Sequence, residues 1–315
     1  MDEGFTDTPQ GVGHGGSKFG HVPVLLKEAI EFLAVKRGGT YIDATVGLGG
    51  HSYEIAKRLG APGHLIGLDK DPAALAEAGV RLRISDLGQS GRAAADWPRI
   101  ELRQASFASL AEVRGPMADG LLADLGVSSL QFGDAARGFS FQAEGPLDMR
   151  MNPQAELTAD QVVNEVDEVT LANLIYEFGE ERRSRRIARA IVRSRPIRST
   201  AHLADVISAA ARSMKHERIH PATRTFQALR IFVNRELDDL RALVETAPQL
   251  LKPGGRLVII SFHSLEDRIV KDALRDGVKQ GHYRLLTKKP VTAGEEEIAQ
   301  NPRARSAKLR AAERI

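Results

Sequence analysis

The sequence contains no cysteine. This absence excludes disulfide bonds, zinc–thiolate sites, iron–sulfur clusters and a thiol nucleophile. The sequence also lacks any apolar run close to the length that spans a bilayer, and its N-terminus has no signal-peptide core. We therefore expect a cytoplasmic protein that does not enter a membrane, and we assign no residue to a metal.

What the chain does have is enough apolar sequence for a full core. Of its 315 residues, 42% are hydrophobic and 27% charged, which suits one large domain or two. Residues 1–20 are glycine-rich and unpatterned, so we expect a disordered leader. The net charge of +3 is unevenly spread, because residues 182–230 hold thirteen Lys or Arg and two acids. Such a surplus indicates a phosphate-binding surface.

Strand-like and helix-like runs alternate along the chain, which predicts an α/β fold with a parallel sheet covered by helices on both faces. Ser264 with Asp267 is expected to cap the helix at 265–275. Residues 85–98 are expected to form a surface loop. The expected strands are 40–45, 64–69, 99–103, 117–124, 256–262, 282–288 and 305–314, and the other expected helices of this part are 23–35, 50–59, 72–82 and 107–113.

A helical segment interrupts this alternation. Residues 158–213 have the periodicity of amphipathic helices and no strand candidate, and one long helix is expected from about 222 to 250. We therefore expect a cofactor-binding domain made of residues 21–129 and 231–315, with a helical insert at 130–230.

A glycine-rich turn follows the first expected strand, in Asp43-Ala-Thr-Val-Gly-Leu-Gly-Gly-His51, and Asp69 ends the next strand. The arrangement is typical of a site for a nucleoside-bearing cofactor, because glycines admit the ligand and the acid binds the ribose hydroxyls. A tight turn without a ligand is the alternative. Asp43 would repel a nicotinamide pyrophosphate but suits the cationic end of S-adenosylmethionine. The pattern therefore favours a class I methyltransferase over an oxidoreductase.

Two further residues lie at strand ends that should face the same crevice. Asp124 ends the fourth strand, at the sheet edge where ligands bind in such folds. A carboxylate that caps a turn is the alternative. Phe107 follows the third strand and is a candidate to lie against adenine or, equally, a plain core residue.

The similarity to a known family is carried by seven segments: Asp43–His51, Asp124–Ser129 with Gln131, Arg137–Phe141, Gly145–Met151, His220–Gln227, Ile260–Arg268 and Asn301–Ser306. Together they resemble the small-subunit ribosomal RNA cytosine-N4 methyltransferase family (RsmH/MraW). The resemblance runs from about His21 to the C-terminus and omits residues 1–20 and 85–98.

The resemblance implies a seven-stranded class I methyltransferase sheet with a helical, RNA-recognising insert. Its implied reaction is S-adenosylmethionine-dependent N4-methylation of a decoding-region cytosine in 16S rRNA, at position 1402 in the family's usual rRNA numbering. The implied partner is small-subunit rRNA in an assembled or nearly assembled subunit, and a homodimer is left open. His51 and Gln131 enter on the resemblance alone. The implied cofactor residues are Gly49, Gly50, His51, Asp69, Phe107, Asp124 and Gln131.

The chemistry of cytosine N4 suggests further roles. Its lone pair is delocalised into the ring, so an acceptor on the N–H helps transfer, and Asp124 is the candidate acceptor, against a purely cofactor-facing role. Many amino-methyltransferases place an Asp/Asn-Pro-Pro-aromatic turn here, whereas this chain has Asp124-Leu-Gly-Val. We therefore expect Phe139 or Phe141 to stack on the base. His263 is a candidate to orient the base or a phosphate, or a structural histidine bonded to backbone.

The insert carries an arginine stripe on one expected helix, which includes Arg185, Arg186 and Arg189. Phosphate contact is the functional interpretation, and a solvated face paired with Glu180 and Glu181 is the alternative. Two other functions stay open on the sequence: a non-catalytic RNA-binding assembly factor on the same fold, and a nicotinamide-dependent oxidoreductase.

Overall fold

The computed structural model describes residues 23–87, 96–112, 118–211 and 219–315. The predicted leader at 1–20 lies outside the described residues, and so does most of the predicted loop at 85–98. The described start of that loop is helical, because α3 runs over Pro72–Leu87 and not only to residue 82. No helix in these described ranges is both long enough and apolar enough to cross a bilayer.

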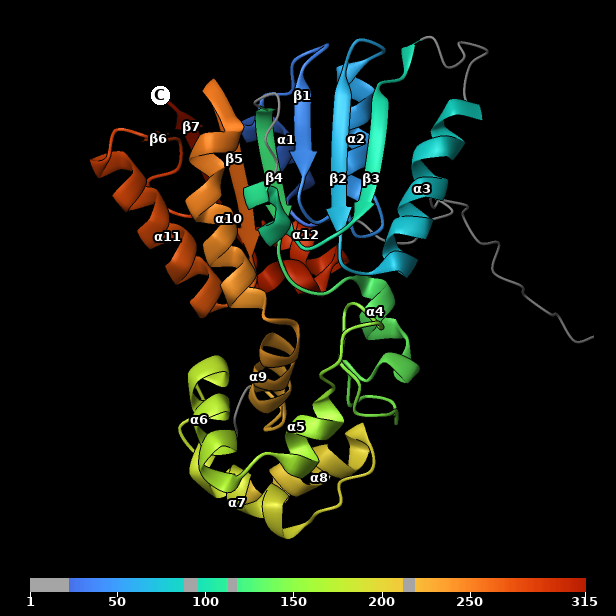
Figure 1. The fold of residues 1–315 in the computed structure, drawn as a ribbon, viewed down its shortest axis with the longest axis vertical. Helices are drawn as coiled ribbons and strands as arrows, with labels where there is room; N and C mark the ends of the chain where they lie inside the picture. The colour runs from blue at the N-terminus through green and yellow to red at the C-terminus, as the bar shows by residue number, and fades with distance from the viewer. Residues whose placement is uncertain (1–22, 88–95, 113–117, 212–218) are drawn as a thin grey trace, which may run out of the picture.

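The centre of the protein is a seven-stranded sheet of order β3-β2-β1-β4-β5-β7-β6 (Figure 1). The first five strands in this order are parallel, while β7 lies antiparallel between β5 and β6. This is the sheet of a class I methyltransferase, as predicted. The strands are β1 Thr40–Asp43, β2 His64–Asp69, β3 Arg99–Gln104, β4 Ala118–Asp124, β5 Leu251–Ser261, β6 Tyr283–Leu285 and β7 Lys308–Arg314.

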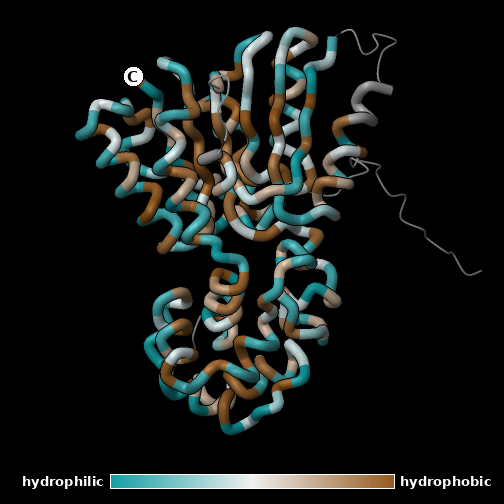
Figure 2. The backbone as a smooth tube through the Cα atoms, in the orientation of Figure 1, coloured by the Kyte–Doolittle hydropathy of each residue, from teal (hydrophilic) through white to brown (hydrophobic). Residues whose placement is uncertain are grey.

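Successive side chains of a strand point to opposite faces of the sheet, and a hydrophobic core lies on each face. On β5, Leu257 and Ile259 join the core that packs under α10 and α11, whereas Val258 and Ile260 join the core under α1 and α2. In Figure 2 hydrophobic residues recur along the central strands of the sheet. The covering elements are α1 Leu26–Leu33, α2 Gly50–Leu59, α3, η2 Phe107–Glu112, α10 Glu236–Leu250 and α11 Ser264–Lys279, with α12 Glu295–Gln300 and η4 Pro302–Ser306 near the last strands.

A helical body lies below the carboxyl ends of the strands and has a hydrophobic core of its own (Figure 1). Helix α7 shows why it folds: Ile187, Ala188 and Ile191 are buried in that core, while the arginines between them face outward. The elements of this part are α4 Ser129–Gly133, η3 Ala135–Arg137, α5 Ala159–Glu165, α6 Glu168–Gly179, α7 Ser184–Arg193, α8 Thr200–Ala211 and α9 Thr223–Asn234.

Two expectations about helices are wrong. The long helix predicted over 222–250 is broken at Arg235, which adopts a left-handed conformation (φ 52°) and separates α9 from α10. The predicted cap of α11 by Ser264 with Asp267 is shifted by one residue, because His263 is the N-cap and Glu266 completes the capping box. Asp267 instead pairs with Arg310 of β7 at 2.7 Å. The acid that the sequence pattern assigned to the helix cap therefore forms a tertiary ion pair instead.

Candidate active site

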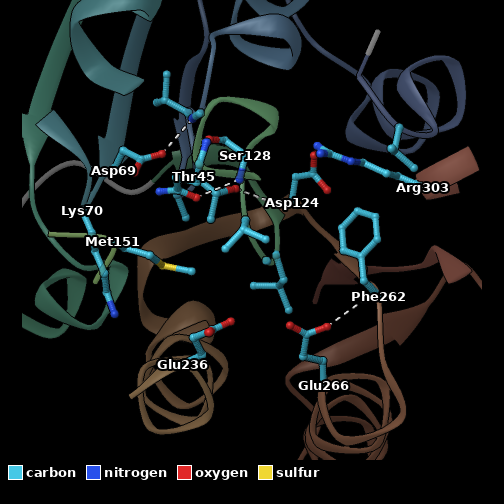
Figure 3. Close-up of a pocket in the computed structure, with 18 of the residues that line it drawn as sticks. Thr45, Asp69, Lys70, Asp124, Ser128, Met151, Glu236, Phe262, Glu266 and Arg303 are labelled. Atoms are coloured by element: carbon cyan, nitrogen blue, oxygen red, sulfur yellow. Dashed lines mark hydrogen bonds between the residues drawn. The ribbon is translucent and has the colours of Figure 1, made fainter. Parts of the chain in front are cut away.

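A cavity of about 330 Å³ opens at the carboxyl ends of the parallel strands, between the sheet and the helical body (Figure 3). Parallel α/β sheets bind ligands at this edge. Its walls come from segments far apart in the sequence. From the sheet side they include Pro23, Gly47, Gly50, His51, Asp69, Lys70, Phe107, Asp124, Glu236, Leu240, Phe262, His263, Glu266, Arg303 and Ser306, and from the helical body Gln131, Phe132, Met151, Gln227 and Arg230.

The glycine turn between β1 and α2 forms one wall. The Gly47 amide donates to Asp69 Oδ2 at 2.8 Å, so the turn is tied to the end of β2. Gly50 cannot carry a side chain, because a Cβ there would lie 2.2 Å from Cγ of Pro23. Gly49 has φ 76° and packs against Ala78, and it does not line the cavity. Gly50 thus borders the cavity, while Gly49 sets the shape of the turn behind it.

Asp69 is held in position by backbone donors. Besides the Gly47 amide, its Oδ1 accepts from the Asp71 amide at 2.9 Å. Burial raises the pKa of Asp69, and the nearby charge of Asp71 acts in the same direction. Each oxygen retains a lone pair toward the cavity, where Figure 3 shows the carboxylate at one end. A diol such as a ribose could donate to it.

The fully buried Asp71 connects this strand end to the segment after β4. Its Oδ2 accepts from Gln131 Nε2 and Arg137 Nη1, both at 2.9 Å. The Gln131 Oε1 accepts from the Ser128 amide at 2.9 Å and closes the capping box of α4. Gln131 therefore lines the cavity and also fixes the loop that follows Asp124. The sequence pattern gave no reason to select Asp71.

Asp43 lies behind the turn and does not line the cavity. Only 1% of it is exposed, and its oxygens accept from Ser52 Oγ at 2.6 Å and the Thr45 amide at 3.2 Å. Burial raises the pKa of Asp43 to about 6, although these two hydrogen bonds oppose the change. Asp43 is therefore not placed for the direct contact with a cofactor that the sequence suggested.

Asp124 points into the middle of the cavity at the end of β4 (Figure 3). Its amide donates to Thr45 Oγ1 at 2.6 Å, and its Oδ2 lies 3.6 Å from Nδ1 of His51, whose Nε2 bonds the Val24 carbonyl at 3.1 Å. Its Oδ1 is buried and has no hydrogen-bond partner among the described residues. Burial, followed by the charges of Asp43 and Glu266, raises the pKa of Asp124 well above its ordinary value.

A second carboxylate, Glu266, faces the same cavity from the start of α11. It accepts from the amides of Phe262 and His263 at 2.8 and 3.2 Å, and His263 Nε2 lies 3.1 Å from its Oε1. Burial alone would raise its pKa, but His263, the charge of Arg230 and the Phe262 amide together lower it. The two carboxylates are thus shifted in opposite directions, an arrangement typical of acid–base sites. His263 is the N-cap of α11 and lines the cavity as well, so both interpretations of it keep support.

The two phenylalanines predicted to stack on a base are not at the cavity. Phe139 is 4% exposed within the core of the helical body, and Phe141 stacks on His220 with ring centroids 4.6 Å apart. The positions of these side chains do not support the prediction. The rings that do line the cavity beyond Asp124 are Phe132 and Phe262.

The arginine stripe lies on the outer face of α7, where Arg185, Arg186 and Arg189 are exposed. Arg189 pairs with Glu168 at 3.2 Å. Glu180 and Glu181, the acids that could have neutralised the stripe, pair with other arginines. Glu180 pairs with Arg268 at 2.9 Å, and Glu181 lies 3.6 Å from Arg224. Most of the stripe therefore keeps its positive charge uncompensated by these two acids.

The sequence matches the model of the MraW methylase family over residues 18–315. It is 66% identical over 319 residues to the ribosomal RNA small subunit methyltransferase H of Koribacter versatilis, covering the whole of both chains. It is 63% identical to the protein of the same name from Acidobacterium capsulatum, over 93% of this chain and 98% of that one.

The chain belongs to the MraW methylase family. This assignment removes the oxidoreductase alternative. A solved structure of an rRNA methylase from Streptococcus thermophilus is 11% identical, covers 92% of this chain and 93% of its own length, and has a TM-score of 0.41, too low to add to the sheet order.

The family's cavity in this chain unites most of the predicted cofactor residues: Gly50, His51, Asp69, Phe107, Asp124 and Gln131 all line it, and Gly49 lies directly behind. The described residues contain no cluster of three or more His, Asp or Glu suited to a metal ion. The sequence interpretation gave no site role to Lys70, Phe132, Arg230, Glu236 and Arg303, which also line the cavity. Arg303 lies in the resembling segment Asn301–Ser306 and Arg230 in the basic stretch 182–230, but neither pattern places a side chain at the sheet edge.

Proposed function

We propose that the protein transfers a methyl group from S-adenosylmethionine to the exocyclic N4 of a decoding-region cytosine in small-subunit rRNA, the position numbered 1402. Membership of a methylase family supports the reaction type, and relatives bearing the name ribosomal RNA small subunit methyltransferase H support the class of RNA. The observation that carries the proposal is Asp124, which lines the cavity and whose buried Oδ1 has no hydrogen-bond partner among the described residues.

The residues present fit the proposed cofactor. Asp69 offers acceptors for a ribose diol, Phe107 offers an apolar wall for a purine, and the side chain at Gly50 is absent where a Cβ would collide with Pro23. Asp124, with Asp43 behind it, supplies the negative field that suits a sulfonium. When bound, S-adenosylmethionine supplies an electrophilic methyl group.

Asp124 is proposed to accept a hydrogen bond from the target amino group. Cytosine N4 gains nucleophilicity when its N–H is held by an acceptor, and Oδ1 of Asp124 is buried with no hydrogen-bond partner in the described part of the chain. The pKa of Asp124 is high in the free protein because the carboxyl group is buried and the charges of Asp43 and Glu266 lie near it. A cation bound nearby favours the charged form of this carboxylate, which is the stronger acceptor.

The Asp124→Asn variant tests this role on small subunits from cells that lack the protein. We expect turnover to fall by about 10²–10⁴-fold, the usual contribution of a positioned acid–base group, with S-adenosylmethionine affinity retained within about tenfold. Asp134→Asn, at an exposed cap outside the cavity, is the matched control and should behave as wild type. Near-normal turnover of Asp124→Asn would eliminate the need for a charged acceptor. Near-normal turnover of Asp124→Ala, which lacks the acceptor oxygen, would eliminate the acceptor role. Mass mapping of rRNA that the wild-type protein has methylated tests the reaction itself.

The exposed face of α7 is proposed to contact rRNA phosphates. Replacing Arg185, Arg186 and Arg189 together by Gln should weaken RNA binding and leave cofactor binding unchanged, because α7 does not line the cavity. On single strands each phosphate contact contributes roughly 0.7 to the slope of log K against log salt. If all three arginines contact phosphates, the magnitude of this slope should therefore decrease by about 2. An unchanged slope would reject phosphate contact by this face.

A further inference from the structure

Arg303 differs from the other basic side chains of the cavity. It lies in η4, whose first turn is fixed by Asn301 Oδ1 accepting from the Arg303 amide at 3.3 Å. Figure 3 shows its side chain reaching in at the end of the cavity occupied by Phe262, away from Asp69. The Arg303 guanidinium lies over the Phe132 ring, 4.9 Å from its centroid, and Nη1 donates to Ser129 Oγ at 2.8 Å.

The other two Lys or Arg side chains of the cavity are neutralised. Lys70 Nζ lies 2.5 Å from Asp239 Oδ2, and Arg230 pairs with Glu236 through two bonds of 2.8 and 2.9 Å. Arg303 has no carboxylate within 4.0 Å in the described part of the chain; its hydrogen-bond acceptor there is a neutral hydroxyl. Partial burial without a counter-charge lowers the pKa of its guanidinium. The residue as a whole is exposed to solvent, so this cation is available to an approaching anion.

The charge of the cavity makes this cation useful for an RNA substrate. Asp69, Asp124, Glu236 and Glu266 all line the cavity, so a polyanion approaching it meets mostly carboxylates. With Lys70 and Arg230 paired, the free positive charge of the lining is concentrated at Arg303. It also lies beside Phe132 and Phe262, the apolar rings beyond Asp124, and not beside the acid that suits a ribose.

We propose that Arg303 binds a backbone phosphate of the target nucleotide and so positions the cytosine at Asp124. The inference rests on the function proposed above. A base taken out of its stack enters a pocket with its phosphates left at the rim. A guanidinium presents a fork of donors that matches two phosphate oxygens, and four of the five N–H donors of Arg303 are not used by the Ser129 bond.

The test compares Arg303→Gln with Arg305→Gln, which removes an equal charge from the same short turn at an exposed residue outside the cavity. Both are assayed with wild type on small subunits that lack the methyl group. For Arg303→Gln we expect kcat/KM to fall about ten- to a hundredfold, the range for a charge-assisted hydrogen bond, with unchanged S-adenosylmethionine affinity. Arg305→Gln should leave kcat/KM unchanged.

Salt dependence separates phosphate binding from a structural role. The slope of log(kcat/KM) against log salt should become shallower by about 0.7 in Arg303→Gln, and Arg303→Lys, which keeps the charge, should retain the wild-type slope. Three results would each overturn the inference: equal kcat/KM for Arg303→Gln and Arg305→Gln, an unchanged salt slope, or weakened S-adenosylmethionine binding, which would assign Arg303 to the cofactor carboxylate. If wild type itself transfers no methyl group to the subunit, the proposed function fails instead.

Discussion

Replacing Asp43 by asparagine is expected to stabilise the cofactor-free protein at neutral pH. The carboxylate is fully buried, and burial raises its pKa from an ordinary 3.8 to about 6. Asparagine can keep both local bonds, because its oxygen accepts from the Thr45 amide and its amide donates to Ser52 Oγ, which reorients. The variant therefore removes a buried charge and leaves the packing in place.

The magnitude follows from the pKa. A folded-state value of about 6 against 3.8 corresponds to about 3 kcal/mol of differential interaction, at 1.36 kcal/mol for each pKa unit. Because the folded state holds the proton more tightly than the unfolded state, wild-type stability is greatest below about pH 4. It falls as pH rises from about 4 to about 6 and is level above that. The Asp43→Asn variant lacks this loss.

Urea denaturation at pH 4, 5, 6 and 7 measures the difference directly. The stability of Asp43→Asn relative to wild type should grow by up to about 3 kcal/mol across this series, whereas Asp134→Asn, at an exposed cap, should run parallel to wild type. Parallel curves for Asp43→Asn as well would refute the reasoning. Calorimetric titration with S-adenosylmethionine at pH 7 should show weaker binding to Asp43→Asn, because the charge that destabilises the free protein favours a cationic ligand.

Two further variants test the walls of the cavity. Gly50→Ala should lose about 1–3 kcal/mol of stability in chemical denaturation, because its Cβ would collide with Pro23, whereas Gly133→Ala, with open space around it, should not lose stability. Arg137→Gln should lose about 3–5 kcal/mol by leaving the buried Asp71 charge without its ion pair, and adding Asp71→Asn should restore part of it. Additive losses in this double variant would contradict direct coupling of the pair.

Local sequence patterns determined the sheet and the cofactor side of the site. An apolar strand, a glycine turn and an acid at the next strand end are encoded within about thirty residues, from Tyr41 to Asp69. Because parallel strands end at the same edge of a sheet, Asp69 and Asp124 had to meet there. The family resemblance added His51 and Gln131, which no periodicity marks. The antiparallel position of β7 between β5 and β6 completes the predicted seven strands.

Predictions that depended on a partner distant in the sequence were the ones that needed the structure. Asp267 was expected at a helix cap and instead pairs with Arg310, and Arg235 breaks a segment whose periodicity continues through it. Phe139 and Phe141 follow the cofactor motifs closely along the chain, yet the core of the helical body buries or packs both. Sequence proximity to a motif does not decide which face of a chain a ring covers.

The sequence by itself determined that this chain is an α/β protein with a glycine-rich turn after its first strand, because strand, turn and helix signals are local. Only the tertiary structure decided what else faces that turn. It brings Phe132, Phe262 and Arg303 to the far end of the cavity from three separate segments, and among the described residues it gives Arg303 no carboxylate partner. The physical reason is that packing of helices and loops against the sheet edge selects side chains by position in space, which no local periodicity records.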